Sequence, residues 1–272
     1  MRIIFFGDVV GKSGRKKLLS LIDKIVSKLK IDFTIVNAEN SAHGFGINPT
    51  IAEKFFMHNI DVLTTGDHIW DQMTIKSYLQ EESRIIRPLN YTKYNDGNGY
   101  KVYTSKNNKK VLVVDLLGTL FMAREGIENP FHTMDDLLKN FKLGQNVDAI
   151  FIDFHAETTS EKMSLAHYLD GRVSAVIGTH THIPTSDNHI LQNGTAFQAD
   201  AGMCGDFNSS IGMKTETSIS RFLGSEERSH LCPAEGEATI CGVIVETDDK
   251  TGLAVSIEPV RIGGILSQTH KI

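Results

Sequence analysis

Five short apolar runs of this chain each end directly in acidic, amide or imidazole side chains, and this pattern constrains the fold most strongly. The runs are dense in Ile, Val and Phe, which favours strands that are covered on both faces. They occupy residues 2–6, 33–38, 61–65, 149–154 and 173–178. Because strand ends of an open α/β sheet meet at one edge, where ligands bind, we expect the polar residues that follow them to form one site.

Amphipathic stretches separate the apolar runs, and this alternation predicts an α/β fold. In residues 15–30, apolar side chains such as Leu18, Ile22 and Leu29 recur at helical spacing. Further helices are expected at residues 49–59, 70–80, 134–141 and 160–171, and a further strand at 110–118. Hairpin-like patterns at residues 100–116, 189–200 and 238–262 predict that the sheets are mixed.

The chain is predicted to form a single domain over residues 1–272, because we see no internal repeat, low-complexity tract or linker that would divide it. A polar stretch at residues 224–230 is expected to form a surface loop. With 40% hydrophobic and 22% charged residues, the composition is that of an ordinary globular protein.

Composition and charge argue against several classes of partner. A net charge of -5 gives no reason to expect an extended nucleic-acid surface or a membrane surface. The apolar run at the N-terminus is too short for a signal peptide, and no run approaches the roughly 18 apolar residues of a membrane helix. Three cysteines without a CxxC pair support neither a disulfide framework nor a thiolate zinc site. A cytoplasmic location is therefore expected.

The side chains at the strand ends are of the types that bind metals through oxygen and imidazole nitrogen. The candidate ligands are Asp8, Glu39, Asn40, Asp67, His155, His180 and His182, and Asp153 and Glu157 share a strand face with His155. In extended backbone, residues two apart point the same way, so His180 and His182 are expected to face one cavity. The set exceeds what one tetrahedral ion needs, which favours two ions sharing a carboxylate, as in phosphoester hydrolysis.

Taken singly, several of these residues have simpler explanations. Asp8 could cap a helix, Glu39 could belong to a turn, and His68 could be a buried structural histidine. Their joint placement at five strand ends favours the metal site. The segment GDVVGKS at residues 7–13 looks like a phosphate-binding P-loop, but only three residues separate its glycines where that motif needs four.

Two further residues are candidates for supporting roles. His43 lies in the glycine-containing segment SAHGFG directly after Asn40, where the glycines allow close approach of a substrate. Asp200 follows a predicted strand and is a candidate support for the ligands.

The segments GDVVG, NAEN, GDHIWD, DFHAETTSEK and GTHTHIPT occur in this order over most of the chain. In this combination, and over roughly residues 1–262, the chain resembles the calcineurin-like binuclear metallophosphoesterase superfamily, and within it the short bacterial YmdB-like family. The resemblance implies an α-β-β-α sandwich of two mixed sheets flanked by helices, with two metals at the strand ends. It also implies a phosphodiesterase that acts on cyclic nucleotides or related small phosphodiesters.

The same resemblance implies a role for each residue. Asp8 and His182 would hold the first metal, Asp67, His155 and His180 the second, Glu39 would bridge both, Asn40 would assist the first metal or the phosphate, and His68 would face the substrate. A hydroxide between the metals would attack phosphorus while His68 acts as general acid. Fe or Mn ions are expected, with Zn or Mg as alternatives, and the protein is expected to be a homo-oligomer.

The third motif departs from the family's pattern, which is GNH where this chain has GDH at residues 66–68. Asp67 adds a third carboxylate against the four positive charges of two divalent ions, and a less positive centre should polarise phosphate less. Two other classes therefore stay open: a metal-binding regulatory protein with weak or vestigial phosphoesterase activity, and a dinuclear iron redox enzyme. The lack of a helical Glu-x-x-His pair argues against the bundle form of the latter.

Overall fold

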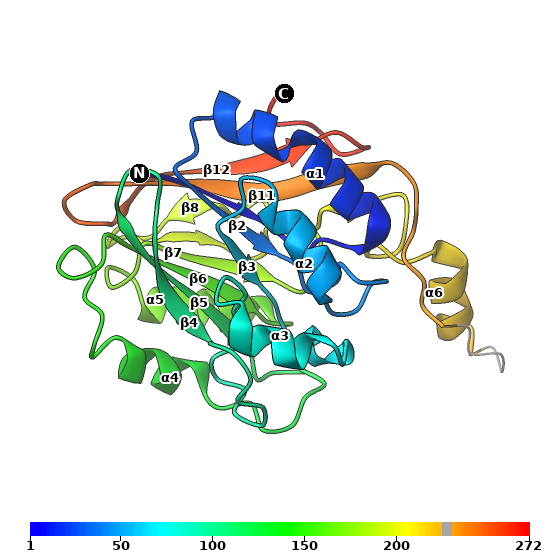
Figure 1. Ribbon diagram of the computed structural model, residues 1–272, viewed down its shortest axis with the longest axis horizontal. Helices are drawn as coiled ribbons and strands as arrows, with labels where there is room; N and C mark the ends of the chain where they lie inside the picture. Colours follow the sequence, from blue (N-terminus) through cyan, green and yellow to red (C-terminus); the bar gives the residue numbers. More distant parts are fainter. Residues whose placement is uncertain (225–229) are drawn as a thin grey trace.

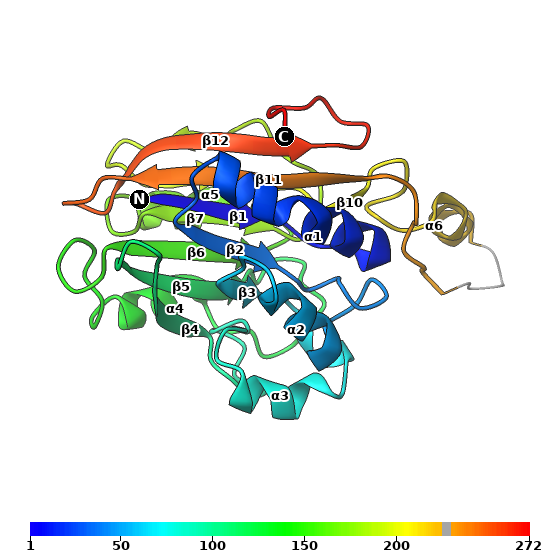
Figure 2. The ribbon, with the colours of Figure 1, turned by 45° about the horizontal axis from the view of Figure 1, so that its top comes forward.

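Two six-stranded sheets lie face to face at the centre of the computed structural model, which describes residues 1–224 and 230–272 (Figures 1 and 2). The first sheet has the order β10-β11-β1-β2-β3, with β12 paired to β11. Its strands are β1 (Arg2–Phe6), β2 (Phe33–Asn37), β3 (Val62–Thr64), β10 (Gly205–Asp206), β11 (Ala238–Thr247) and β12 (Ala254–Ile262). Strands β1, β2 and β3 are parallel, whereas β11 runs antiparallel to β1.

The second sheet has the order β4-β5-β6-β7-β9-β8. Its strands are β4 (Tyr100–Thr104), β5 (Lys110–Leu117), β6 (Ala149–His155), β7 (Ala175–Thr179), β8 (His189–Ile190) and β9 (Ala196–Gln198). The inner strands β5, β6, β7 and β9 are parallel, and β4 and β8 are antiparallel to their neighbours. Both sheets are therefore mixed, as the hairpin patterns predicted.

Alternating residues of the buried strands serve two different cores. Phe5 of β1 and Phe151 of β6 point between the sheets, where their ring centroids lie 5.3 Å apart. Ile4 and Phe6 point the other way and pack under the helices. Because both faces of these strands are covered, they lack polar alternation, which explains the continuous apolar runs of the sequence.

Helices cover the outer face of each sheet (Figures 1 and 2). Helices α1 (Gly11–Lys28), α2 (Pro49–Phe56) and α3 (Ile75–Glu81) pack on the first sheet, and α4 (Pro130–Leu137) and α5 (Thr159–Tyr168) pack on the second. This layer order confirms the predicted α-β-β-α sandwich. None of the helices in the described part of the chain has the length and apolar character needed to cross a bilayer.

Several boundaries differ from the sequence expectation. The helix expected at residues 70–80 is split into a 3-10 turn, η1 (Ile69–Asp71), and α3, because Gln72 is extended and its side-chain amide donates to Phe45 O at 2.8 Å. Helix α4 begins at Pro130 instead of residue 134, since Asn129 caps it with a side-chain oxygen.

Two short elements were not predicted. Strand β10 has two residues, too few for a periodic pattern, and α6 (Thr215–Phe222) is rich in Ser and Thr, which are weak helix formers. Helix α6 stands apart from the sheets at one end of the molecule (Figures 1 and 2). Most of the loop expected at residues 224–230 lies outside the described residues.

Candidate metal centre

The carboxyl ends of strands from both sheets meet at one edge of the sandwich. Asp8 follows β1, Glu39 follows β2 and Asp67 follows β3, so the first sheet supplies the carboxylates. His155 ends β6, and His180 and His182 follow β7, so the second sheet supplies the imidazoles. The five strand ends that the sequence singled out therefore do converge, and the site lies at the seam between the layers.

The imidazole of His155 lies at the middle of this cluster. Its Nε2 atom is 2.7 Å from Glu39 Oε2, 3.6 Å from Asp67 Oδ1 and 2.9 Å from His180 Nδ1. Ligand atoms of Asp67, His155 and His180 lie within 4.8 Å of one another, as do those of Asp8, Glu39 and His155. A third such group joins Glu39, Asp67 and His68. Glu39 thus belongs to groups on both sides of the cluster, which is the position expected of a bridging carboxylate.

Each of the three acids directs one oxygen outward and leaves the other in the cluster. Glu39 Oε1 accepts the His68 backbone N–H at 2.6 Å, and Asp8 Oδ2 accepts that of His180 at 3.3 Å. Asp8 Oδ1, Glu39 Oε2 and Asp67 Oδ1 are buried and accept no hydrogen bond from the described residues. Because burying carboxylate oxygens without partners is costly, this arrangement fits residues that hold cations.

His182 and Asn40 extend the cluster on the side of Asp8. His182 Nδ1 lies 2.7 Å from Ile211 O, so Nδ1 carries the proton and donates it to that carbonyl. His182 Nε2 then presents a lone pair, 3.2 Å from Asn40 Oδ1 and 3.9 Å from Asp8 Oδ1. The Asn40 amide nitrogen donates to Gly44 O at 3.0 Å, which turns Oδ1 toward the histidine. Electron-pair donors that face one another in this way are suited to a shared cation.

The backbone around the two histidines after β7 is not extended. His180 has φ 93° and His182 has φ 68°, in the left-handed region that non-glycine residues avoid. The expectation that extended geometry alone aligns the pair is therefore wrong, and both imidazoles reach the cluster from a strained turn.

Asp200 holds that turn in place. Its Oδ2 accepts the Thr181 backbone N–H at 3.0 Å and the Thr181 hydroxyl at 2.7 Å. The same oxygen lies 3.1 Å from Lys162 Nζ, and the side chains of Lys162 and Asp200 are 2% and 1% exposed. Asp200 therefore supports the turn that carries the two candidate ligands. Lys162 is a supporting residue that sequence reasoning missed, although it lies within the motif DFHAETTSEK.

A buried polar layer lies beneath His155. The Nδ1 atom of His155 is 3.0 Å from Thr179 Oγ1, and this hydroxyl donates to Asp153 Oδ1 at 2.7 Å. Asp153 also accepts from Asn37 at 2.9 Å and from Thr64 at 2.5 Å. These contacts direct His155 Nε2 into the cluster. Burial, partly offset by the Thr64 and Thr179 hydrogen bonds, raises the pKa of Asp153 to about 7.

The charges of the cluster perturb its own titration. Burial alone would lower the pKa of His155, but the charge of Glu39 and the close approach of the Asp67 and Glu39 carboxylates raise it well above its ordinary range. Burial and then the charge of His155 lower the pKa of His180 to about 3. Burial would raise the pKa of Asp67, yet the close approach and charge of the His155 imidazole lower it below its usual range.

His68 lies at the mouth of the cluster, with 28% of its side chain exposed. Its Nδ1 atom is 2.6 Å from Asp71 Oδ2, and its ring packs edge-on against Phe45 with centroids 5.0 Å apart. Asp71 and Phe45 were not identified as site residues from the sequence. Glu157 is partly exposed and lies 3.0 Å from His180 Nε2. His68 is therefore partly open to solvent beside the cluster.

His43 is the one predicted site residue that is not brought against the cluster. It is exposed, in the left-handed conformation with φ 56°, on the turn that follows Asn40. The described residues include no hydrogen bond or ion pair of its imidazole with the candidate ligands.

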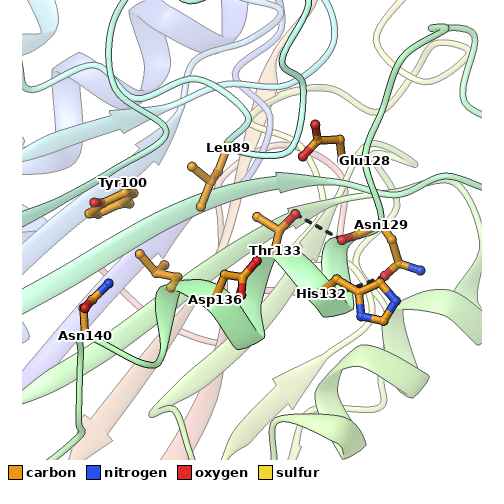
Figure 3. A pocket seen from close by; sticks show the side chains of 9 residues that line it. Leu89, Tyr100, Glu128, Asn129, His132, Thr133, Asp136 and Asn140 are labelled. Atoms are coloured by element: carbon orange, nitrogen blue, oxygen red, sulfur yellow. Dashed lines mark hydrogen bonds between the residues drawn. The ribbon is translucent and has the colours of Figure 1, made fainter.

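A second hollow lies elsewhere and lacks the features of the cluster. It has a volume of about 510 Å³ and is lined by Leu89, Tyr100, Glu128, Asn129, His132, Thr133, Asp136, Leu137 and Asn140 (Figure 3). Asn129 and Thr133 are engaged in the first turn of α4, where the Thr133 hydroxyl donates to Asn129 O at 3.0 Å. None of the candidate ligands lines this hollow, so the functional candidate stays at the strand edge.

Comparisons with known proteins agree with this geometry. The sequence model of the family described as YmdB-like protein matches residues 4–260. A 2',3'-cyclic-nucleotide 2'-phosphodiesterase of Bacillus subtilis is 40% identical over 262 residues, which cover 96% of this chain and 97% of the relative. The crystal structure of a novel phosphatase of Mycoplasma pneumoniae is 35% identical, with a TM-score of 0.89, and the match covers 97% of this chain and 93% of that one. A 5'-nucleotidase of Candida albicans is similar in fold alone. It is 13% identical with a TM-score of 0.57, and the match covers 96% of this chain and 51% of the nucleotidase chain.

Proposed function

The chain belongs to the YmdB-like protein family, as its five motifs predicted, and on this premise we propose that it is a metal-dependent phosphodiesterase. The observation that carries the proposal is the set of three buried carboxylate oxygens without hydrogen-bond partners in the described residues, which face imidazole nitrogens at the strand ends. The cyclic-nucleotide activity in the name of the Bacillus subtilis relative supports cyclic nucleotides and related small phosphodiesters as the substrate class.

The proposed centre holds two divalent cations. Asp8, Asn40 and His182 would bind one, Asp67, His155 and His180 the other, and Glu39 would lie between them. Oxygen and imidazole donors without thiolate favour Fe or Mn, with Zn or Mg as alternatives. When bound, two such ions make water nucleophilic near neutral pH and neutralise charge on the phosphate oxygens.

Protons are handled by the chain's own residues. We assign to His68 the protonation of the leaving oxygen when its bond to phosphorus breaks. Asp71 accepts from His68 Nδ1 at 2.6 Å, so Nε2 is the atom that would deliver a proton outward. The edge-on contact with Phe45 limits rotation of the ring. Thr179 and Asp153 would keep His155 Nε2 directed at the centre.

Substitution of Glu39 tests this proposal. With added Mn²⁺, the wild-type protein is expected to hydrolyse bis-p-nitrophenyl phosphate and a 2',3'-cyclic nucleotide. Glu39→Gln removes the carboxylate between the two ions, so metal content and kcat/KM should both fall, the latter by about 100-fold or more. Glu128→Gln, at the rim of the second hollow, is the matched control and should leave both unchanged. A Glu39→Gln protein with full metal content and full activity would refute the mechanism.

A metal-binding regulatory protein with weak phosphoesterase activity is the second candidate, and the added charge of Asp67 is the observation that favours it. A regulatory protein of this kind would bind two ions and hydrolyse phosphoesters at a rate near background.

The third candidate is a dinuclear iron redox enzyme. An oxygen-consumption assay on the metal-loaded protein tests it.

We further propose the following properties of the whole chain. A single domain over residues 1–272 is supported by the pairing of β1 with β11, which joins the two ends of the sequence. Cytoplasmic location is supported by three free cysteines. A homo-oligomer is supported by the exposed apolar side chains of Ile219, Phe222 and Leu223 at α6, and light scattering on the purified protein measures it.

A further inference from the structure

Arg124 lies against the candidate centre, although no motif of the sequence marked it. Its Nε atom is 3.3 Å from Asp67 Oδ2, and its Nη2 atom donates to Asp71 Oδ1 at 2.9 Å. We infer that Arg124 is the counter-ion that allows this chain to carry an aspartate at position 67. In this role it is a positioning residue, which acts on the metals and on phosphate through Asp67.

The two oxygens of Asp67 face different partners. Oδ1 points to His155 Nε2 at 3.6 Å and accepts no hydrogen bond from the described residues, whereas Oδ2 faces the guanidinium. Arg124 therefore leaves the metal-facing oxygen available while it fixes the rotation of the carboxylate. The side chain of Asp67 is only 6% exposed, so its charge is poorly screened by water and a neighbouring cation matters.

Arg124 is carried on an anchored segment between β5 and α4. At the start of this segment, Glu161 Oε1 accepts both the backbone N–H and the hydroxyl of Thr119 at 2.8 Å. At its end, the Glu128 backbone N–H donates to Asn90 O at 2.8 Å. The segment that carries Arg124 is thus fixed at both ends, and Arg124 contacts two carboxylates. These features distinguish it from an arginine in a lone surface ion pair, which contributes little to stability.

The charges of the centre add up in favour of this role, which rests on the proposed function. Two divalent ions against Asp8, Glu39 and Asp67 leave one net positive charge, since 4 minus 3 is 1. Arg124 raises the sum to 2, which equals the sum for two divalent ions and two carboxylates when position 67 is asparagine. A centre of that charge attracts an anionic phosphodiester and polarises it more strongly.

A counter-ion makes two readouts move in opposite directions. Arg124→Met removes a cation next to a ligand, so the affinity of the metal-free protein for Mn²⁺ should rise a few-fold. The loaded centre is then less positive, so kcat/KM for bis-p-nitrophenyl phosphate should fall about tenfold. A change that only disordered the site would weaken both metal binding and turnover.

The decisive experiment is a double-mutant cycle between positions 67 and 124. Mn²⁺ affinity is measured by titration calorimetry, and kcat/KM on the Mn²⁺-loaded protein. Adding Asp67→Asn to Arg124→Met should restore most of the lost kcat/KM, because the uncompensated charge is gone. Arg124→Lys should retain part of the activity, since it keeps the charge without the fork geometry. Arg172→Met is the matched control, because Arg172 forms a comparable half-exposed ion pair with Asp135 away from the centre.

Two results would overturn the inference. If Arg124→Met lowers kcat/KM by the same factor in the wild-type chain and in the Asp67→Asn variant, Arg124 binds phosphate directly. If Arg124→Met lowers kcat/KM in neither protein, Arg124 forms only an inert surface ion pair. If the wild-type protein hydrolyses no phosphoester with any metal, the proposed function fails. In that case the Mn²⁺ affinities measured by calorimetry still test the inference. The inference predicts that Arg124→Met raises Mn²⁺ affinity only when Asp67 is present.

Discussion

His68 and His58 are two histidines with similar local partners and different surroundings. His68 Nδ1 lies 2.6 Å from Asp71 at the mouth of the centre, and His58 Nδ1 lies 2.8 Å from Asp23 on the surface. We predict that His68→Ala lowers kcat by about 100-fold or more, because the leaving oxygen loses its proton donor. Metal content, measured by elemental analysis, should stay at the wild-type value. His58→Ala is the control and should leave kcat unchanged, and a His68→Ala protein that loses its metals would make His68 a ligand instead.

Thr179 connects a ligand to its buried support. Thr179→Val keeps the shape of the side chain but removes the hydroxyl between His155 and Asp153. We predict that Mn²⁺ affinity, measured by calorimetry, falls about 10- to 100-fold, as is usual when a partner of a metal ligand is lost. Thr195→Val removes another buried hydroxyl, which donates to Val173 O, and should leave Mn²⁺ affinity intact. Equal affinities for the two variants would contradict the role of Thr179.

The sequence could predict the candidate ligands because each directly follows an apolar strand. It could not predict Arg124, whose partner Asp67 is 57 positions away and whose own segment carries no motif. Lys162 was missed for the same reason, since its partner Asp200 is 38 positions away. The positive φ angles of His180 and His182 were also not predictable, because the contacts that hold this turn come from distant residues such as Asp200 and Ile211.

At the scale of elements, the first turn of α5 supports two separate segments of the site. Thr158 caps the helix, Glu161 holds the segment that begins at Thr119, and Lys162 reaches Asp200 on the other side. One short helix thus holds both the loop that carries Arg124 and the turn that carries His180 and His182. The motif at residues 153–162 thus extends from the end of β6 into the first turn of α5.

Lys162→Met tests this support. The substitution leaves Asp200 buried without its cation, so the free energy of unfolding, measured by urea denaturation, should fall by about 3–5 kcal/mol. Mn²⁺ affinity should fall as well, because the turn at Thr181 loses its fixed partner. Lys139→Met, in an exposed ion pair with Asp136 on α4, serves as the control and should change neither quantity measurably. A stable Lys162→Met protein with normal metal affinity would show that Asp200 needs only its backbone donors.

For the molecule as a whole, the proposed centre takes side chains from both sheets and lies beside the hydrogen bonds that Asp153 of the second sheet accepts from Asn37 and Thr64 of the first. Metal removal should therefore lower the stability of the entire sandwich. We predict that chelation lowers the thermal midpoint, and that excess Mn²⁺ raises the free energy of unfolding by about 2.7 kcal/mol at 100 times its dissociation constant. Differential scanning calorimetry of wild type and Glu39→Gln measures the effect. If both proteins respond equally to Mn²⁺, the stabilising ion is bound outside the proposed centre.

The alternation of strands and helices was predictable because buried strands and amphipathic helices leave different periods in the sequence, whereas the two-sheet sandwich was implied by the family resemblance. The placement of the site at the seam of two sheets was not, since strand patterns do not say which strands share a sheet. Asp67 and His155 follow strands of different sheets, whose faces are joined by the packing of Phe5 against Phe151 and by the hydrogen bonds of Asn37 and Thr64 to Asp153.

The division of ligands between the sheets also orders events during synthesis. The carboxylates of Asp8, Glu39 and Asp67 precede β4, whereas His155, His180 and His182 follow residue 154. A growing chain that leaves the ribosome therefore displays these acids well before the imidazoles of the proposed centre are synthesised. In the proposed centre, binding of metal at full affinity would have to wait until β7 and the turn after it have emerged, so truncated products would stay without the ion.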